Sequence, residues 1–371
     1  MVKQPSMGLL WVIGIVLILL GVVYFSINPQ TSILKIGVIA PLSGELEMNG
    51  TQMQNAYNLA LSKINEAGGI NGKTVELLFK DGACDADQTT AHMQELLNVE
   101  EVFYVIGGGC AVESDAISKL TQEAQTLFIS ASTFNWQEDN SLSFSLQPTL
   151  ANEIVLLATA GYEDGHTRAA VFYQDSSMSE YVLSAFEGAY EGAVVFSETF
   201  ETQEDLDGLM TTLRYANPQM VLIVPEDSAS GVMVIDTLDS NWFNVGMYAT
   251  SAIIDQEAFL ETPSTYEELV IADSQIGDGD AAQAFLSGYE LMYSAAPELP
   301  MIAASAYDGL TLLAEALTQT GGDSEAAAEY LSSQVNAYSG ATGTFSFDES
   351  GNTDLMPVLV QVTAGELVEI E

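Results

Sequence analysis

The stretch that decides the fold runs from Val102 to Ala111 and reads VFYVIGGGCA. An apolar segment of strand length ends in three glycines, and a helical pattern follows, with Ala116, Ile117 and Leu120 on one face. Glycine lets the backbone approach a ligand closely, and the amide groups at a helix start point outward without partners. The stretch therefore predicts a buried strand, a tight loop and a helix start that can hold a polar ligand. A strand–helix turn without a ligand is the open alternative.

Strand and helix patterns alternate on both sides of this stretch. The first series has strand candidates at 33–39, 74–79, 103–106 and 127–130. After Pro148 a second series has strand candidates at 168–173, 194–196, 220–224 and 246–248. Two helical stretches and a β-like end follow, at 281–293, 302–317, 344–347 and 357–362. The alternation predicts two α/β layers with parallel sheets, and a small-molecule site between them at the carboxyl ends of the strands.

The charge balance limits the possible partners. The 371 residues include 52 Asp and Glu but only 8 Lys and Arg, for a formal net charge of −44. Such a surface repels nucleic acid and anionic lipid, so we expect no nucleic-acid partner. The scarcity of basic residues suggests the hypothesis of a surface adapted to high salt. That hypothesis fails if the protein is equally stable in low and molar salt.

The N-terminal region predicts a membrane anchor. Residues 7–25 (MGLLWVIGIVLILLGVVYF) are apolar without a break, close to the roughly 20 residues that span a bilayer. Lys3 precedes the span, so the positive-inside rule places residues 1–6 in the cytoplasm. Residues 26–32 form a linker, and the bulk of a single-pass cell-membrane protein lies outside. A cleaved signal peptide is the alternative, but its shorter apolar core and Ala-x-Ala-like site are not seen.

The two cysteines, Cys84 and Cys110, each follow a predicted strand. In an extracytoplasmic protein they would form a disulfide, which stabilises a loop of this length by roughly 3–4 kcal/mol. Two buried thiols are the alternative. Two cysteines and two scattered histidines are too few for a zinc site, so we expect no metal.

Catalytic chemistry is not indicated. His92 lies in a polar helix and His166 in a turn, and no set of nucleophile, base and orienting group is recognisable. A nucleotide-binding fingerprint is also missing. We therefore expect a protein that is not an enzyme and uses no cofactor.

Several short motifs, taken in order, carry a resemblance to a known family. They are KIGVIAPLSG at 35–44, INEAGGINGK at 64–73, DGACD at 81–85, VIG at 105–107, AYDG at 306–309 and GTFSFD at 343–348 with Gly351. Each motif is weak alone, but their order and spacing are specific. Over residues 33–370 the chain resembles the branched-chain amino-acid (leucine-isoleucine-valine) binding proteins of ABC transporters, with the type I periplasmic-binding fold.

The resemblance implies two Rossmann-like lobes joined by a three-crossing hinge, which close on a ligand. It assigns residues 33–150 and 277–346 to lobe 1, and 151–276 and 347–371 to lobe 2. The family's paired cysteines match Cys84 and Cys110, which favours the disulfide.

The implied function is that of a membrane-anchored, extracytoplasmic solute-binding protein. It would capture a small polar ligand, possibly an amino acid, and deliver it to an ABC permease. A ligand-sensing ectodomain that docks onto a separate signalling partner is the alternative.

The family's ligand contacts in the first lobe follow the third and fourth strands. By the resemblance, the ligand-binding positions are Gly109, Cys110, Ala111, Ser132 and Thr133. The family usually has a serine at the position of Ala111, and backbone amides do much of the binding there.

Two further residues in the first lobe have two interpretations each. Asn49 matches a loop at the mouth of the family's cleft, but it also begins the sequon Asn49-Gly50-Thr51, and we expect it first to cap a helix. Glu113 would repel a ligand carboxylate, or it is a helix-start acid that interacts favourably with the helix dipole.

Departures from the family pattern are larger in the second lobe. The family's aromatic residue beside a glycine falls at Met178, and its acid for the ligand ammonium falls near Ser251. Glu226 or Asp227 could replace that acid, although most acids of this chain are expected to be solvated. Related family members bind amides, urea or aromatic acids, so the resemblance leaves the ligand class open.

Overall fold

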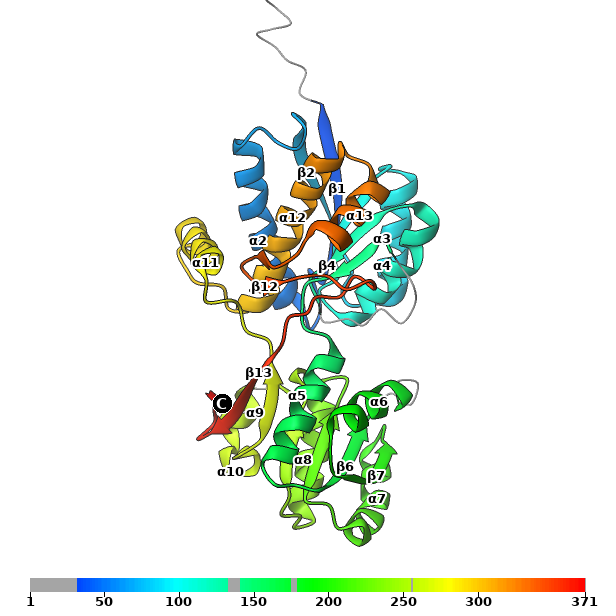
Figure 1. Cartoon of the computed structure of the whole chain (residues 1–371), viewed down its shortest axis with the longest axis vertical. Coiled ribbons are helices and arrows are strands. Elements are labelled where there is room, and N and C mark those ends of the chain that lie inside the picture. Colours follow the sequence, from blue (N-terminus) through cyan, green and yellow to red (C-terminus); the bar gives the residue numbers. More distant parts are fainter. Residues whose placement is uncertain (1–31, 133–140, 175–178, 255, 371) are drawn as a thin grey trace, which may run out of the picture.

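The computed structural model of the chain describes residues 32–132, 141–174, 179–254 and 256–370. Two α/β lobes lie one above the other along the long axis of the molecule (Figure 1). The predicted α/β fold with two lobes is therefore confirmed. Within the described residues no helix has the length and apolar character to cross a membrane. The predicted span at 7–25 lies outside the described residues and stays a prediction.

The first lobe is built on a five-stranded parallel sheet with the order β2-β1-β3-β4-β5. Its strands are β1 (Ile33–Ala40), β2 (Thr74–Asp81), β3 (Tyr104–Gly107), β4 (Leu127–Ser130) and β5 (Ser143–Ser145). Its helices are α2 (Glu47–Glu66), α3 (Ala86–Asn98), α4 (Ala111–Ala124), α11 (Asp280–Tyr293), α12 (Pro300–Thr320) and α13 (Ser324–Gln334).

Both faces of this sheet are buried, which explains the continuous apolar run of β1. Ile36 and Val38 pack in a core with α2 and α12, whereas Ile39 points the other way into a core with α3 and α4. The small antiparallel pair β11 (Tyr338–Ser339) and β12 (Thr344–Phe345) belongs to the same lobe.

The second lobe contains a seven-stranded mixed sheet with the order β14-β13-β10-β9-β8-β6-β7. The parallel strands are β6 (Arg168–Tyr173), β7 (Ala193–Thr199), β8 (Met220–Val224), β9 (Gly246–Ala249) and β10 (Val270–Asp273). Two antiparallel strands, β13 (Val358–Thr363) and β14 (Glu366–Ile370), extend the sheet. The helices are α5 (Leu150–Glu163), α6 (Ser179–Ala189), α7 (Gln203–Ala216), α8 (Ser228–Ser240), α9 (Gln256–Glu261) and α10 (Pro263–Tyr266), with the 3-10 turn η2 (Ser251–Ile253).

The chain passes between the lobes three times, after β5, after β10 and before β13 (Figure 1). The first two crossings leave the carboxyl ends of β5 and β10, so the carboxyl ends of both parallel sheets lie toward the other lobe. Asn152 Nδ2 donates to the carbonyl of Leu355 at 2.9 Å and ties the first crossing to the third. Phe347 and Leu355 pack in the core of the first lobe, so we place the third crossing after Leu355 and not before Phe347.

Several elements have no counterpart in the predicted series, among them β5, β10, β14 and α13. β5 reads Ser-Phe-Ser, and its serines are buried through hydroxyl contacts instead of apolar packing: Ser145 Oγ donates to the Ser132 carbonyl at 3.2 Å. β10 has only four residues, and two acidic residues, Glu267 and Glu268, precede its apolar run from Leu269. Strands as short as β5 and β10 leave too few positions for a hydrophobic period to be recognised.

Candidate functional site

The candidate site consists of two surfaces that lie toward each other. The first strand-end face is formed by the loops after β1, β2, β3 and β4, and the second strand-end face by the loops after β6, β8, β9 and β10. Open α/β sheets bind ligands outside the carboxyl ends of their strands. All of the sequence-predicted ligand residues that the structure describes lie on or beside these two faces.

The glycine loop after β3 forms as the sequence predicts. Gly107 has a φ of 131°, and a Cβ added there would lie 1.9 Å from the carbonyl oxygen of Ile39, so only glycine fits. The loop ends at Cys110, the N-cap of α4, whose side chain forms no capping hydrogen bond. The first turn of α4 therefore keeps its amides without a side-chain cap, and Ala111 at its start is exposed.

Cys110 cannot cap the helix because its sulfur is bonded to Cys84, with a Cα–Cα distance of 6.1 Å. The predicted disulfide is thus confirmed, and the alternative of two buried thiols is wrong. The bond joins the loop after β2 to the loop after β3, so two neighbouring parts of the first strand-end face are covalently fixed.

Glu113 joins the same two loops through hydrogen bonds. Its side chain is fully buried, Oε2 accepts from the Gly109 amide at 2.9 Å, and Oε1 accepts from the Cys84 amide at 3.1 Å. Burial raises the pKa of the Glu113 carboxyl, and the two amide bonds act in the opposite direction. The interpretation as a helix-start acid is confirmed, and in addition the carboxylate holds the loop that carries Cys84.

Ser132 lies in a cluster of buried hydroxyl groups behind the glycine loop. Ser114 Oγ is 2.8 Å from both Ser130 Oγ and Ser132 Oγ, and these two are 3.3 Å apart. Gln147 Nε2 donates to the Ala131 carbonyl at 2.6 Å beside them. The hydroxyl groups of this first-lobe cluster therefore bind one another. Thr133, the neighbouring predicted residue, lies outside the described residues.

Asn49 corrects one prediction. Helix α2 begins at Glu47 with Leu46 as its N-cap, so Asn49 lies inside the first turn and does not cap the helix. Its Nδ2 instead donates to the Gly109 carbonyl at 3.4 Å, which brings it to the first strand-end face. Gly50 is required because a Cβ there would lie 2.0 Å from the Pro41 carbonyl oxygen.

In the second lobe the structure shows a residue that the sequence did not single out. Glu153, in the first turn of α5, is 1% exposed and accepts from Ser251 twice, from the amide at 2.9 Å and from Oγ at 2.8 Å. An acid therefore lies beside Ser251 after all, from a helix that begins at the first crossing. Burial raises the pKa of Glu153 to about 7, the bonds from Ser251 oppose this, and the charge of Asp273 adds to it.

The other predicted second-lobe residues are less buried. Asp227 is the N-cap of α8, and its Oδ1 accepts a capping hydrogen bond from the Ser230 amide at 2.8 Å. Glu226 is exposed, and its amide donates to Gln174 Oε1 at 2.9 Å. Met178 lies outside the described residues. Glu153 is therefore more buried than Glu226 or Asp227, and it is the acid that contacts Ser251.

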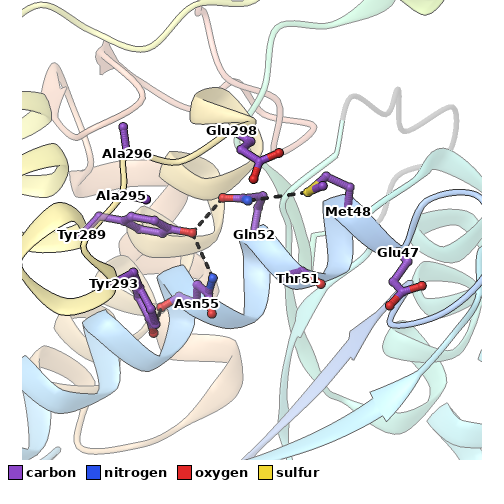
Figure 2. Close-up of a pocket in the computed structure, with 10 residues that line it drawn as sticks. All are labelled: Glu47, Met48, Thr51, Gln52, Asn55, Tyr289, Tyr293, Ala295, Ala296 and Glu298. Carbon is purple, nitrogen blue, oxygen red and sulfur yellow. Dashed lines mark hydrogen bonds between the residues drawn. The ribbon is translucent and has the colours of Figure 1, made fainter.

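A separate groove of about 490 Å³ lies between α2 and α11 (Figure 2). Tyr289 Oη donates to Gln52 Oε1 at 2.7 Å and accepts from Asn55 Nδ2 at 3.1 Å, while Tyr293 Oη donates to the Asn55 carbonyl at 2.9 Å. These polar groups bind one another and hold α11 on α2, which is a structural role. Among the described residues no three His, Cys, Asp or Glu side chains are grouped so that they could hold a metal ion.

The arrangement of two lobes, three crossings and opposed strand ends defines a class of ligand-binding proteins that hold a solute between their lobes. A sequence profile described as periplasmic binding protein matches residues 33–366. The chain therefore belongs to the periplasmic binding protein family, a family of binding proteins and not of enzymes. The predicted resemblance is confirmed.

Individual relatives are distant but cover nearly the whole chain. A "Leucine-, isoleucine-, valine-, threonine-, and alanine-binding protein" of Pseudomonas aeruginosa is 24% identical over 351 residues, which is 89% of each chain. The crystal structure of a leucine-binding protein from Thermotoga maritima has a TM-score of 0.76 at 19% identity, and covers 91% of this chain and 98% of that one. A solute-binding protein of R. palustris in complex with 4-hydroxybenzoate also has a TM-score of 0.76 at 19% identity, and covers 92% and 96%.

Proposed function

We propose that the protein is the solute-binding component of an ABC transporter and captures a small polar ligand between its strand-end faces. The observation that carries the proposal is the pair of opposed faces, one with the uncapped start of α4 and the other with the buried Glu153. Amides at a helix start and a buried acid are groups that fix the orientation of a small polar molecule. The binding of branched-chain amino acids by relatives supports the same class of ligand.

The proposed ligand contacts come from both faces. In the first lobe they are Asn49, Gly109, Cys110, Ala111, Ser132 and Thr133. In the second lobe they are Met178, Glu226 and Ser251, to which the structure adds Glu153. We rank Glu153 above Glu226 as the partner of a ligand cation because it is buried and held by Ser251.

The remaining parts of the proposal concern location and delivery. We propose that residues 7–25 anchor the chain with its lobes outside the cytoplasm, a location that the disulfide supports. Carbonate washing should leave the full-length chain in the membrane fraction, and deleting residues 1–31 should release it. Delivery to a permease predicts neighbouring genes for an ABC permease and an ATPase. A neighbouring kinase gene would instead favour the alternative function, a ligand-sensing ectodomain that docks onto a separate signalling partner.

Ligand capture is tested by thermal unfolding of the full-length chain in mild detergent. The panel contains branched-chain and other amino acids, amides, urea, aromatic acids and small sugars, in low and high salt. A ligand at a hundred times its dissociation constant adds about 2.7 kcal/mol to the free energy of unfolding, which gives a measurable shift. If no compound raises the unfolding temperature under any condition, solute capture is wrong.

A further inference from the structure

Among the described residues, the loops that form the two strand-end faces contain no Lys or Arg. Seven of the eight Lys and Arg residues lie in the described part of the chain, and the eighth is Lys3. Three of the seven form salt bridges: Lys35 with Glu100, Lys80 with Glu95 and Lys119 with Asp115. Three donate hydrogen bonds: Lys63 to Tyr307 Oη, Arg168 to the carbonyls of Ala216 and Asn217, and Arg214 to the carbonyl of Asn241. Lys73 lies in the turn before β2. The sequence of 133–140, 175–178 and 255 contains no Lys or Arg either.

Carboxylates, by contrast, gather at the second strand-end face. Glu153 is buried, and Asp273 at the end of β10 is close enough for its charge to act on Glu153. The β9–β10 register ends with Ile271 opposite Ala249, so Ser251 and Asp273 each follow the end of this pairing by two residues on neighbouring strands. Within the described residues no positive side chain neutralises this pair of acids.

Two buried hydroxyl groups that follow the carboxyl ends of β9 and β10 also have no hydrogen-bond partner among the described residues. Thr250 is 1% exposed, and its Oγ1 has no hydrogen-bond partner among the described residues. Ser274, directly after Asp273, also has a buried Oγ without a hydrogen-bond partner among the described residues. A buried hydroxyl without a partner is unfavourable, and native structures rarely keep one without a reason. A cationic ligand at the ends of these two strands would offer hydrogen-bond donors to such hydroxyls and would supply the missing positive charge.

The first strand-end face also disfavours a carboxylate. The buried carboxyl group of Glu113 already accepts the Gly109 and Cys84 amides directly behind the start of α4. A ligand anion at that helix start would lie near this carboxyl group, and no Lys or Arg of the described residues is among the groups that act on it.

We propose that the ligand is an organic cation: an amine without a free carboxylate, whose positive end binds at Glu153, Thr250 and Asp273. The inference rests on the proposed function and narrows its ligand class. It separates this chain from the R. palustris protein, whose complex holds 4-hydroxybenzoate.

The test compares compounds of similar shape that differ in charge, by calorimetric titration and thermal unfolding of the full-length chain. The cationic probes are isoleucinamide, benzamidine and methylammonium, and the matched compounds are isoleucine, benzoate and acetate. A charged hydrogen bond to Glu153 predicts that benzamidine and methylammonium bind at least about tenfold tighter than benzoate and acetate. Isoleucine and isoleucinamide both carry an ammonium group, so this pair tests the carboxylate alone, and isoleucinamide should bind more tightly. The proposal is overturned if a carboxylate compound binds equally or more tightly, or if no cation binds. Solute capture itself survives those results as long as any compound of the wider panel binds.

Variants distinguish a ligand contact from a structural role. Thr250→Val removes the hydroxyl at nearly constant shape, so the free protein should unfold at the same or a higher temperature while cation affinity falls about fivefold or more. Ser197→Ala is the matched control, because Ser197 Oγ on β7 is also buried without a partner but lies away from the site. It should leave cation affinity unchanged. Unaltered affinity in Thr250→Val, or an equal loss in both variants, would contradict the proposal.

Discussion

The two strand-end faces differ in how far their polar groups are satisfied without a ligand. In the first lobe a disulfide, the amide bonds to Glu113 and the serine cluster around Ser132 fix the loops. In the second lobe Glu153 and Asp273 lack a positive partner among the described residues, and the Thr250 hydroxyl lacks a hydrogen bond. The loops of the first face are therefore fixed before binding, and only the start of α4 stays without a side-chain cap, whereas buried polar groups of the second face would gain their partners on binding. Affinity should therefore depend most on the second face, and stability on the first.

Removing the disulfide should have the largest effect and should be confined to the first lobe. Replacing Cys84 and Cys110 by serine releases a link between positions 26 residues apart, which costs about 3–4 kcal/mol on the chain-entropy model. Hydrogen exchange followed by mass spectrometry should show faster exchange in β3 and β4 and unchanged exchange in β8 and β9. Equal loss of protection in both sheets would show that the lobes do not differ in this way.

The second prediction concerns the acid of the second face. The pKa of Glu153 is raised from 4.5 to about 7 in the folded protein, mainly by burial. The folded state therefore binds this proton more tightly than the unfolded state. Stability should fall as the pH rises from about 4.5 to about 7, by about 3 kcal/mol, and this contribution stays constant above and below that window. Burial also raises the pKa of Asp273, so it acts in the same direction.

Glu153→Gln isolates that contribution, and chemical denaturation at pH 5 and pH 8 measures it. The variant should lose less stability than the natural protein between these pH values. Glu163→Gln is the matched control, since Glu163 is exposed at the other end of the same helix. If Glu153→Gln keeps the full pH dependence, Glu153 is not the buried acid that distinguishes the second face.

Local patterns were enough to predict the first face, but not the second. The glycine loop, its helix start and Cys110 are contiguous in sequence, so their geometry follows from backbone rules. Glu153 is 98 residues from Ser251, and one acid among 52 carries no signal of its own. The recognisable clue was its position in the first turn of a helix that begins at Leu150 with Thr149 as N-cap, beside a predicted crossing. At Asn49 the local pattern was misleading. Asparagine is a common capping residue, so Asn49 was predicted to cap the helix, but it lies inside the first turn of α2.

The smallest effects come from a pair of helical glycines, one in each lobe. A Cβ at Gly50 of α2 would lie 2.0 Å from the Pro41 carbonyl, so Gly50→Ala should push α2 away from the loop after β1 and cost about 1–3 kcal/mol. Gly208 of α7 is exposed with open space around it, so Gly208→Ala should stabilise the chain by about 0.5–1 kcal/mol.

Chemical denaturation of both variants, together with ligand titration, makes the pair a test of the first face. Gly50 neighbours Asn49, whose side chain donates to the Gly109 carbonyl, so moving α2 should also weaken ligand binding. Gly208→Ala should leave binding unchanged, because α7 contributes no residue to either face. If Gly50→Ala lost neither stability nor affinity, the loops of the first face would tolerate a shift of α2. The evidence that these loops are fixed without a ligand would then be the disulfide and the Glu113 hydrogen bonds alone.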